Sequence, residues 1–108
     1  MQSPELAVGE LERLKNNGLK GIQIGSNIDD KNLNDPEYYP IWETCEKLDL
    51  AVLIHPWNMM GQKHMGRYWL PWLVGMPAET SRAICSMIFG GIFDKYPNND
   101  YSLYNKNL

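Results

Sequence analysis

The sequence has 108 residues, of which 44% are hydrophobic and 21% charged, and its net charge is −3 from 10 basic and 13 acidic residues. This length allows at most one domain, and the composition is that of a globular protein rather than a disordered one. No cluster of lysine and arginine marks a nucleic-acid surface, and every apolar run is shorter than the ~18 residues of a membrane span. We therefore expect neither a nucleic-acid nor a membrane partner.

The chain begins with the pattern of a helix. Ser3 is a capping residue, and a proline and a glutamate follow it, so the helix is predicted to run to about Lys15. Its apolar face would be formed by Leu6, Leu11 and Leu14. The acidic amphipathic start does not have the order of a secretory signal, which predicts a cytosolic protein. After a glycine cap, Lys20–Gly25 is predicted to be a short strand.

A second helix and a second strand follow a polar loop. Asp35 is the expected cap of a helix that begins at Pro36 and ends near Leu48. Leu50–His55 is continuously apolar up to its histidine, which is typical of a parallel strand covered on both faces. Because a helix connects the two strands, a parallel crossover is the default arrangement.

A third helix is predicted to begin at residues 76–80 and to continue to Ile92, and residues 94–97 would close it. The remainder, residues 98–108, has no clear period and is predicted to be irregular. Cys45 and Cys85 lie forty positions apart with no CxxC pair, so we expect two reduced thiols on helices.

These elements amount to about two parallel strands and three helices, too few to close a sheet. A complete (β/α)₈ barrel needs roughly 250 residues. The fold class is therefore predicted to be α/β, a fragment of a (β/α)₈ TIM-like barrel, with a partial barrel domain at residues 1–97 and an irregular tail at 98–108. Uncovered strand faces and edges predict weak cooperativity and self-association of the isolated chain.

His55 is the strongest candidate for chemistry, because a histidine at the end of a buried strand is where α/β enzymes place metal ligands and catalytic groups. The alternative is a polar side chain satisfied by neighbouring backbone. His64 lies among Gln62, Lys63 and Arg67 and is interpreted as a solvated loop residue. Glu79 is explained by the positive end of its helix dipole rather than by acid–base work.

Three segments carry a family resemblance: GIQIGSNI at the first strand, VLIHPWNMMG around His55, and YWLPWLVGMPAETSRAICSMIFGGIFDKYP after it. Together they resemble the amino-carboxymuconate-semialdehyde decarboxylases of the metal-dependent amidohydrolase superfamily. The resemblance implies a distorted (β/α)₈ barrel with one divalent metal, usually zinc, at the carboxyl ends of the strands. It also implies decarboxylation of the amino-carboxymuconate semialdehyde in tryptophan (kynurenine) catabolism, which limits quinolinate and NAD synthesis, by a homodimeric enzyme.

The resemblance assigns roles to four residues. His55 matches the metal ligand on a middle strand, and Trp72 matches a tryptophan of the substrate pocket. Trp57 and Met59 match pocket positions beside the metal. The family's His-X-His pair, its histidine followed by glycines and its last-strand aspartate have no counterpart here, so no catalytic residue is assigned to this chain. The change of pattern after Pro97 is that of a truncated or alternatively spliced product, or of an imperfect gene model.

The leading hypothesis is therefore a zinc-dependent carbon–carbon lyase by descent that is inactive as an isolated chain. A second hypothesis is a non-catalytic fragment, or an association partner of a full-length enzyme. A third keeps the superfamily but changes the reaction, to a related hydrolase or to decarboxylation of aromatic acids.

Overall fold

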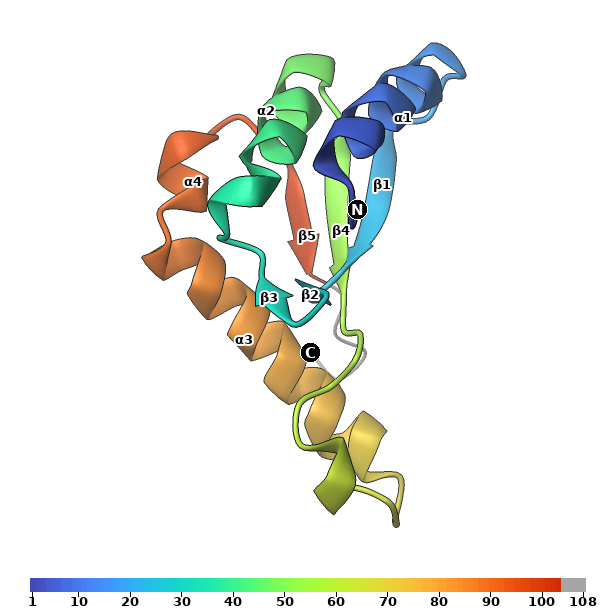
Figure 1. Cartoon of the computed structure of the whole chain (residues 1–108), viewed down its shortest axis with the longest axis vertical. Helices are drawn as coiled ribbons and strands as arrows, with labels where there is room; N and C mark the ends of the chain where they lie inside the picture. The colour runs from blue at the N-terminus through green and yellow to red at the C-terminus, as the bar shows by residue number, and fades with distance from the viewer. Residues whose placement is uncertain (104–108) are drawn as a thin grey trace.

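A computed structural model describes residues 1–103, and its centre is a sheet of three parallel strands (Figure 1). The strand order is β1 (Gly21–Gly25), β4 (Ala51–His55) and β5 (Tyr101–Leu103). Gly25 lies opposite His55 in the register of β1 and β4. Because all three strands are parallel, their carboxyl ends lie at one end of the sheet, the lower end in Figure 1.

Helices and short turns connect these strands. The α-helices are α1 (Pro4–Asn16), α2 (Tyr39–Leu48), α3 (Met76–Phe89) and α4 (Ile92–Lys95). The shorter turns are η1 (Pro36–Tyr38), η2 (Gln62–His64) and η3 (Pro71–Gly75), the last a π-helix that leads directly into α3. A separate antiparallel pair, β2 (Asn27–Ile28) and β3 (Lys31–Asn32), lies in the crossover from β1 to β4.

The predicted α/β class with parallel strands is confirmed, and so is the helix start at Asp35, whose side chain accepts a hydrogen bond from the Glu37 amide at 3.0 Å. The predicted third helix is divided, because Gly91 adopts a left-handed φ of 71° and Ile92 begins a new helix. The prediction of irregular structure for 98–108 is wrong for Tyr101–Leu103, which pair with the free edge of β4. Residues 104–108 lie outside the described part of the chain.

The core lies on one face of the sheet, where Figure 1 shows α1 and α2 in front of the strands. Val52 and Ile54 of β4 are buried there at 0% and 1% exposure, whereas Leu53 and His55 point to the opposite face and are half-buried. The expectation that this strand is covered on both faces is therefore corrected for the described residues. The helix face is completed by Leu11 of α1, Trp42 and Cys45 of α2, Ala83 and Met87 of α3, and Ile92 of α4.

Burial raises the pKa of the Cys45 thiol to about 12, so this thiol stays protonated at neutral pH. Cys85 is exposed, and both cysteines are free, as predicted. Within the part of the chain that the structure describes, no helix combines the length and the apolar character needed to cross a membrane.

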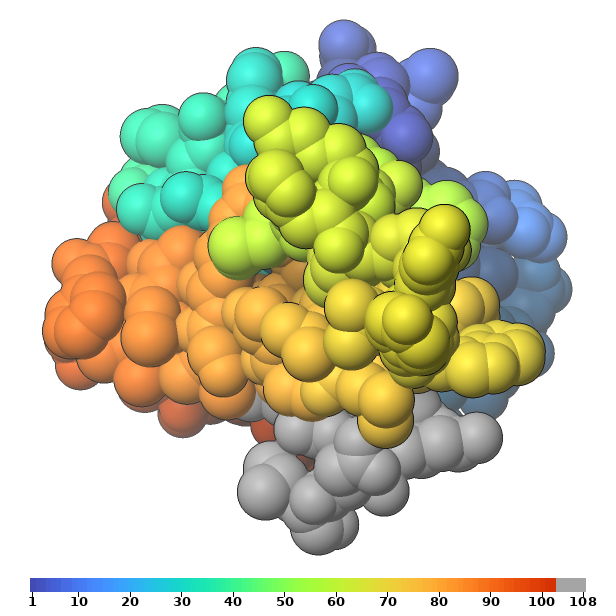
Figure 2. All heavy atoms as spheres, turned by 90° about the horizontal axis from the view of Figure 1, so that it is seen from below, coloured from blue at the N-terminus to red at the C-terminus, as the bar shows by residue number. Residues whose placement is uncertain are grey.

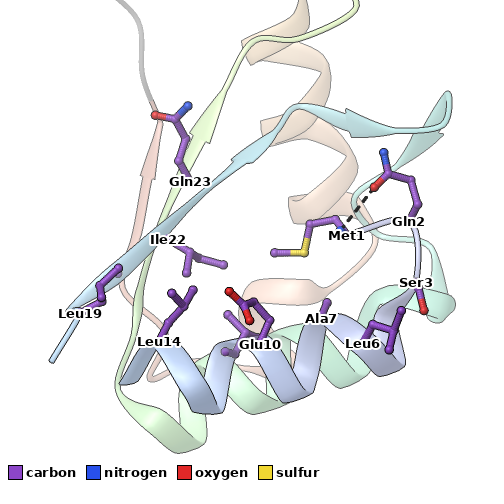
Figure 3. A pocket seen from close by; sticks show the side chains of 12 residues that line it. Met1, Gln2, Ser3, Leu6, Ala7, Glu10, Leu14, Leu19, Ile22 and Gln23 are labelled. Carbon is purple, nitrogen blue, oxygen red and sulfur yellow. Dashed lines mark hydrogen bonds between the residues drawn. The ribbon is translucent and has the colours of Figure 1, made fainter. Parts of the chain in front are cut away.

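An apolar groove of about 630 Å³ lies between α1 and the outer edge of β1 (Figure 3). Ile22 points from β1 toward α1 and meets Leu14 across the groove, while Gln23 points away to the other face of the sheet. Leu6 was predicted to lie on the buried face of α1 but is 75% exposed at this groove, and Leu19 is 43% exposed. The groove leaves apolar side chains in contact with water along the outer edge of β1, with which no other strand of residues 1–103 pairs.

We expect the purified 108-residue chain to self-associate through this apolar surface, because exposed strand edges and contiguous apolar patches favour association. Replacing Leu6 by lysine places a charge at the groove without removing a buried side chain. Light scattering coupled to size-exclusion chromatography is expected to show a larger monomer fraction for Leu6→Lys. The control is Glu12→Lys, an exposed change of larger charge elsewhere on the same helix. A single, monodisperse peak with the mass of a monomer for the unmodified chain would contradict this prediction.

Candidate active site at the carboxyl ends of the strands

Polar and aromatic side chains gather where β1 and β4 end. Gly25 ends β1 and is followed by Ser26 and Asn27, and His55 ends β4, two residues before Trp57. Figure 2 looks toward this end of the molecule, where the chain after β4 and the beginning of α3 form much of the visible surface. This is the end at which parallel α/β folds place their ligands and catalytic groups.

The ring of His55 is oriented by the backbone of the next residue. Its Nδ1 atom lies 2.9 Å from the carbonyl oxygen of Pro56. Since a carbonyl oxygen only accepts, this contact is a hydrogen bond when Nδ1 carries the proton, and the lone pair then belongs to Nε2. Metal-binding histidines commonly use this arrangement, with one nitrogen donating to a carbonyl and the other binding the metal.

His55 and Trp57 line the same hollow, which has a volume of about 360 Å³. Gly25 and Asn27 form another part of its wall. A Cβ atom at Gly25 would lie 3.0 Å from the Asn27 carbonyl oxygen and 3.2 Å from Trp57 Cβ, so a glycine allows the two strand ends to approach this closely. Trp57 itself is 68% exposed, so its ring is accessible to a ligand.

The two other predicted pocket residues lie elsewhere in this structure. Trp72 is 54% exposed and lines a separate hollow of about 390 Å³ together with Trp69, whose ring it meets edge to face at 5.1 Å between centroids. Met59 is half-buried, and a Cβ atom at Gly75 would lie 3.1 Å from its side chain. The structure thus brings Trp57 and His55 together, and the roles assigned to His55, Trp57, Trp72 and Met59 all stay predictions.

A buried carboxylate lies beneath the segment that follows β4. Glu79, in the first turn of α3, is 0% exposed. Its Oε1 accepts hydrogen bonds from the Met60 amide at 3.0 Å and from Arg82 Nη1 at 3.1 Å. Its Oε2 accepts from Ser26 Oγ at 3.0 Å and from Asn27 Nδ2 at 3.1 Å. The interpretation of Glu79 through the helix dipole alone therefore missed its main partners.

Ser26 and Asn27, which the sequence did not single out, are buried at 1% and 4% exposure. Both also hold Trp57: its amide donates to Ser26 Oγ at 3.0 Å, and its carbonyl accepts from Asn27 Nδ2 at 2.8 Å. A polar pair directly after a strand is common in loops, so only the fold reveals that these side chains turn inward.

Within residues 1–103, no three His, Cys, Asp or Glu side chains gather where they could hold a metal ion. His55 offers one ligand, whereas catalytic zinc sites use about three protein ligands. The residues described here therefore do not form a metal centre by themselves, and any metal at His55 needs donors from other parts of an assembly.

A parallel β/α sheet with a histidine at the carboxyl end of a strand is an arrangement found in α/β barrels. The chain belongs to the amidohydrolase family, whose profile matches residues 1–101. It is 62% identical over 99 residues to 2-amino-3-carboxymuconate-6-semialdehyde decarboxylase of Dictyostelium discoideum, a match that covers 91% of this chain and 28% of that enzyme. The resemblance inferred from the sequence is thereby confirmed.

Two solved structures extend the comparison. The 5-carboxyvanillate decarboxylase LigW of Sphingomonas paucimobilis superposes with a TM-score of 0.83 at 32% identity, over 93% of this chain and 31% of that one. A dihydroxybenzoic acid decarboxylase of Polaromonas sp. JS666, with bound manganese and the inhibitor 2-nitroresorcinol, gives 0.77 at 31% identity, over 95% and 34%. These neighbours are TIM-barrel decarboxylases, so the predicted barrel class is confirmed. The chain spans about 30% of their length.

Proposed function

We propose that this chain forms the middle-strand part of the active site of a metal-dependent decarboxylase that acts on amino-carboxymuconate semialdehyde. The observation that carries the proposal is the position of His55 at the carboxyl end of β4, in one hollow with Trp57, within a segment 62% identical to the Dictyostelium enzyme. A place in tryptophan catabolism, where the decarboxylation limits quinolinate and NAD synthesis, follows from that substrate. A cytosolic location and a homodimeric complete enzyme are part of the same proposal.

In this proposal His55 contributes one ligand to a divalent metal. Zinc is the metal that the resemblance implies, and the manganese in the Polaromonas relative makes a divalent ion reasonable for this site. Such an ion supplies a bound water of lowered pKa, and thus a proton donor and acceptor at neutral pH. The residues of this chain bind and orient: the Pro56 carbonyl fixes the imidazole, and the exposed ring of Trp57 offers a flat apolar surface to the substrate.

The isolated chain is expected to be inactive, because its whole sequence contains two histidines and one of them, His64, lies on the exposed η2 turn. The non-catalytic hypothesis therefore describes the isolated molecule, and the decarboxylase hypothesis describes the segment within a complete barrel. The third hypothesis, a change of reaction, is supported by the relatives that decarboxylate aromatic acids.

A chimera tests the proposal. In the Dictyostelium enzyme, the segment that aligns with this chain is replaced by the 99 matched residues. We expect the chimera to release CO₂ from amino-carboxymuconate semialdehyde with a kcat/KM within about tenfold of the parent, since a 1.4 kcal/mol change in transition-state binding corresponds to tenfold. The assay follows loss of substrate absorbance and CO₂ release.

The same chimera separates the alternatives. Preferential turnover of 2,6-dihydroxybenzoate or 5-carboxyvanillate would favour an aromatic-acid decarboxylase, and hydrolysis without CO₂ release would favour a hydrolase. A chimera that folds with the circular dichroism and melting temperature of the parent but turns over none of these substrates would contradict an active-site role for this segment.

A further inference from the structure

The buried carboxylate of Glu79 joins three segments that are far apart in the sequence. Its hydrogen-bond donors come from the residues after β1, from the loop after β4 and from α3 itself. Arg82 extends this network, because its Nε donates to Asn32 Oδ1 at 2.8 Å and its Nη2 donates to the Asp30 carbonyl at 3.2 Å. One buried side chain thus connects the hairpin, the loop and the helix around the hollow that contains His55.

Burial makes this carboxylate effective as an anchor. Glu79 is 0% exposed and accepts four hydrogen bonds, two at each oxygen, while the Arg82 side chain beside it is 24% exposed. Charged acceptors form shorter and stronger hydrogen bonds than neutral ones. If the acceptor were lost, four donors directed at one buried point would lack a partner, and each unsatisfied donor is costly.

The network reaches His55 through a single peptide unit. The Pro56 carbonyl, which accepts from His55 Nδ1 at 2.9 Å, and the Trp57 amide, which donates to Ser26 Oγ at 3.0 Å, belong to the same planar group. Ser26 Oγ in turn lies 3.0 Å from Glu79 Oε2. The hydroxyl therefore fixes the amide side of this peptide plane, and the carbonyl side of the same plane holds the imidazole.

We propose that Glu79 is a positioning residue, which acts through Ser26 and the Pro56–Trp57 peptide to set the orientation and tautomer of the His55 ring. This inference rests on the proposed function, in which His55 is a metal ligand. Glu79 makes no contact with the reacting atoms in this role. It keeps the Nδ1–H to carbonyl hydrogen bond in place, so that the lone pair of the ring stays on Nε2.

Glu79→Gln tests the proposal in the 108-residue chain, because it preserves the shape of the side chain. In either orientation, the new amide NH₂ faces donors: Met60 N–H and Arg82 on one side, or Asn27 on the other. We expect hydrogen exchange of the segment 57–60 to become at least about tenfold faster, the effect of an unsatisfied buried donor. In chain labelled with ¹⁵N-histidine, we expect the His55 ring to change from the Nδ1–H form to a mixture of tautomers.

The matched control is Glu43→Gln, the same change at an exposed carboxylate of α2. It should leave both the exchange of residues 57–60 and the ring spectrum of His55 unchanged, and exchange of the buried β4 amides should be unchanged in both variants. A folded Glu79→Gln chain with unaltered exchange at 57–60 and an unaltered His55 tautomer would overturn the proposal.

If Glu79→Gln does not fold, the variant Ser26→Ala tests the positioning role of Glu79 instead. This change removes the link between Glu79 and the Trp57 amide but leaves the Met60 hydrogen bond intact. The expected result is a changed His55 tautomer with the Met60 amide still protected, and an unchanged tautomer would refute the positioning role. Neither readout requires metal or turnover, so a failure of the decarboxylase proposal in the chimera remains distinguishable from a failure of this inference.

Discussion

Replacing His55 by alanine in the chimeric enzyme is expected to lower decarboxylation by more than about 100-fold, because losing even an outer-shell partner of a metal ligand costs 10–100-fold. Catalytic sites supply about three protein ligands, so removing one leaves an incomplete site. Metal content per subunit, measured by mass spectrometry after dialysis, should fall together with the activity.

The control is His64→Ala, which removes the other histidine of the chain from the exposed η2 turn. It should retain the metal content and the kcat/KM of the unmodified chimera. A His55→Ala chimera that keeps its metal and its rate would show that the proposed ligand has another role, even if the chimera itself is an active decarboxylase.

Replacing Trp42 by alanine is expected to lower the free energy of unfolding of the 108-residue chain strongly. Trp42 is 0% exposed, its Nε1 donates to the Leu33 carbonyl at 3.1 Å, and its ring meets Tyr101 edge to face at 6.1 Å between centroids. Removal of a buried tryptophan costs about 3–5 kcal/mol, which is a large part of the ~5–15 kcal/mol that stabilises an ordinary domain. Urea unfolding followed by far-ultraviolet circular dichroism measures the loss.

Trp57→Ala is the matched control, because this tryptophan is 68% exposed and lies outside the helix-covered core. Surface substitutions usually change the free energy of unfolding by no more than about 0.5 kcal/mol. Equal losses of stability for both variants would mean that the buried face of the sheet is not the main source of stability.

The sequence predicted the elements whose signals are local. A serine or aspartate followed by proline located the starts of α1 and of the η1–α2 segment, although Ser3, unlike Asp35, makes no side-chain capping hydrogen bond. The apolar run before His55 located β4 within one residue. Composition could not show that β4 has one covered and one open face, because Leu53 is as apolar as Val52 and Ile54. That distinction depends on which neighbours the chain brings to each face.

The tail and the buried network were missed for the same reason. Tyr101–Leu103 has a weak strand pattern of its own and becomes a strand by pairing with the edge of β4. Glu79 has a sufficient local explanation in the first turn of a helix, and its partners Ser26 and Asn27 lie about fifty residues earlier, at separations of 53 and 52. Local sequence patterns cannot indicate that positions so far apart in the chain are in contact.

The division of the sheet into a helix-covered face and an open face has a consequence for how variants of this protein should be screened. Val52 and Ile54 are buried against the helices, while their neighbour His55 lies half-buried on the other face. If His55 acts as proposed, a substitution there can therefore leave the melting curve almost unaltered, and a thermal-shift assay would not detect the loss of activity.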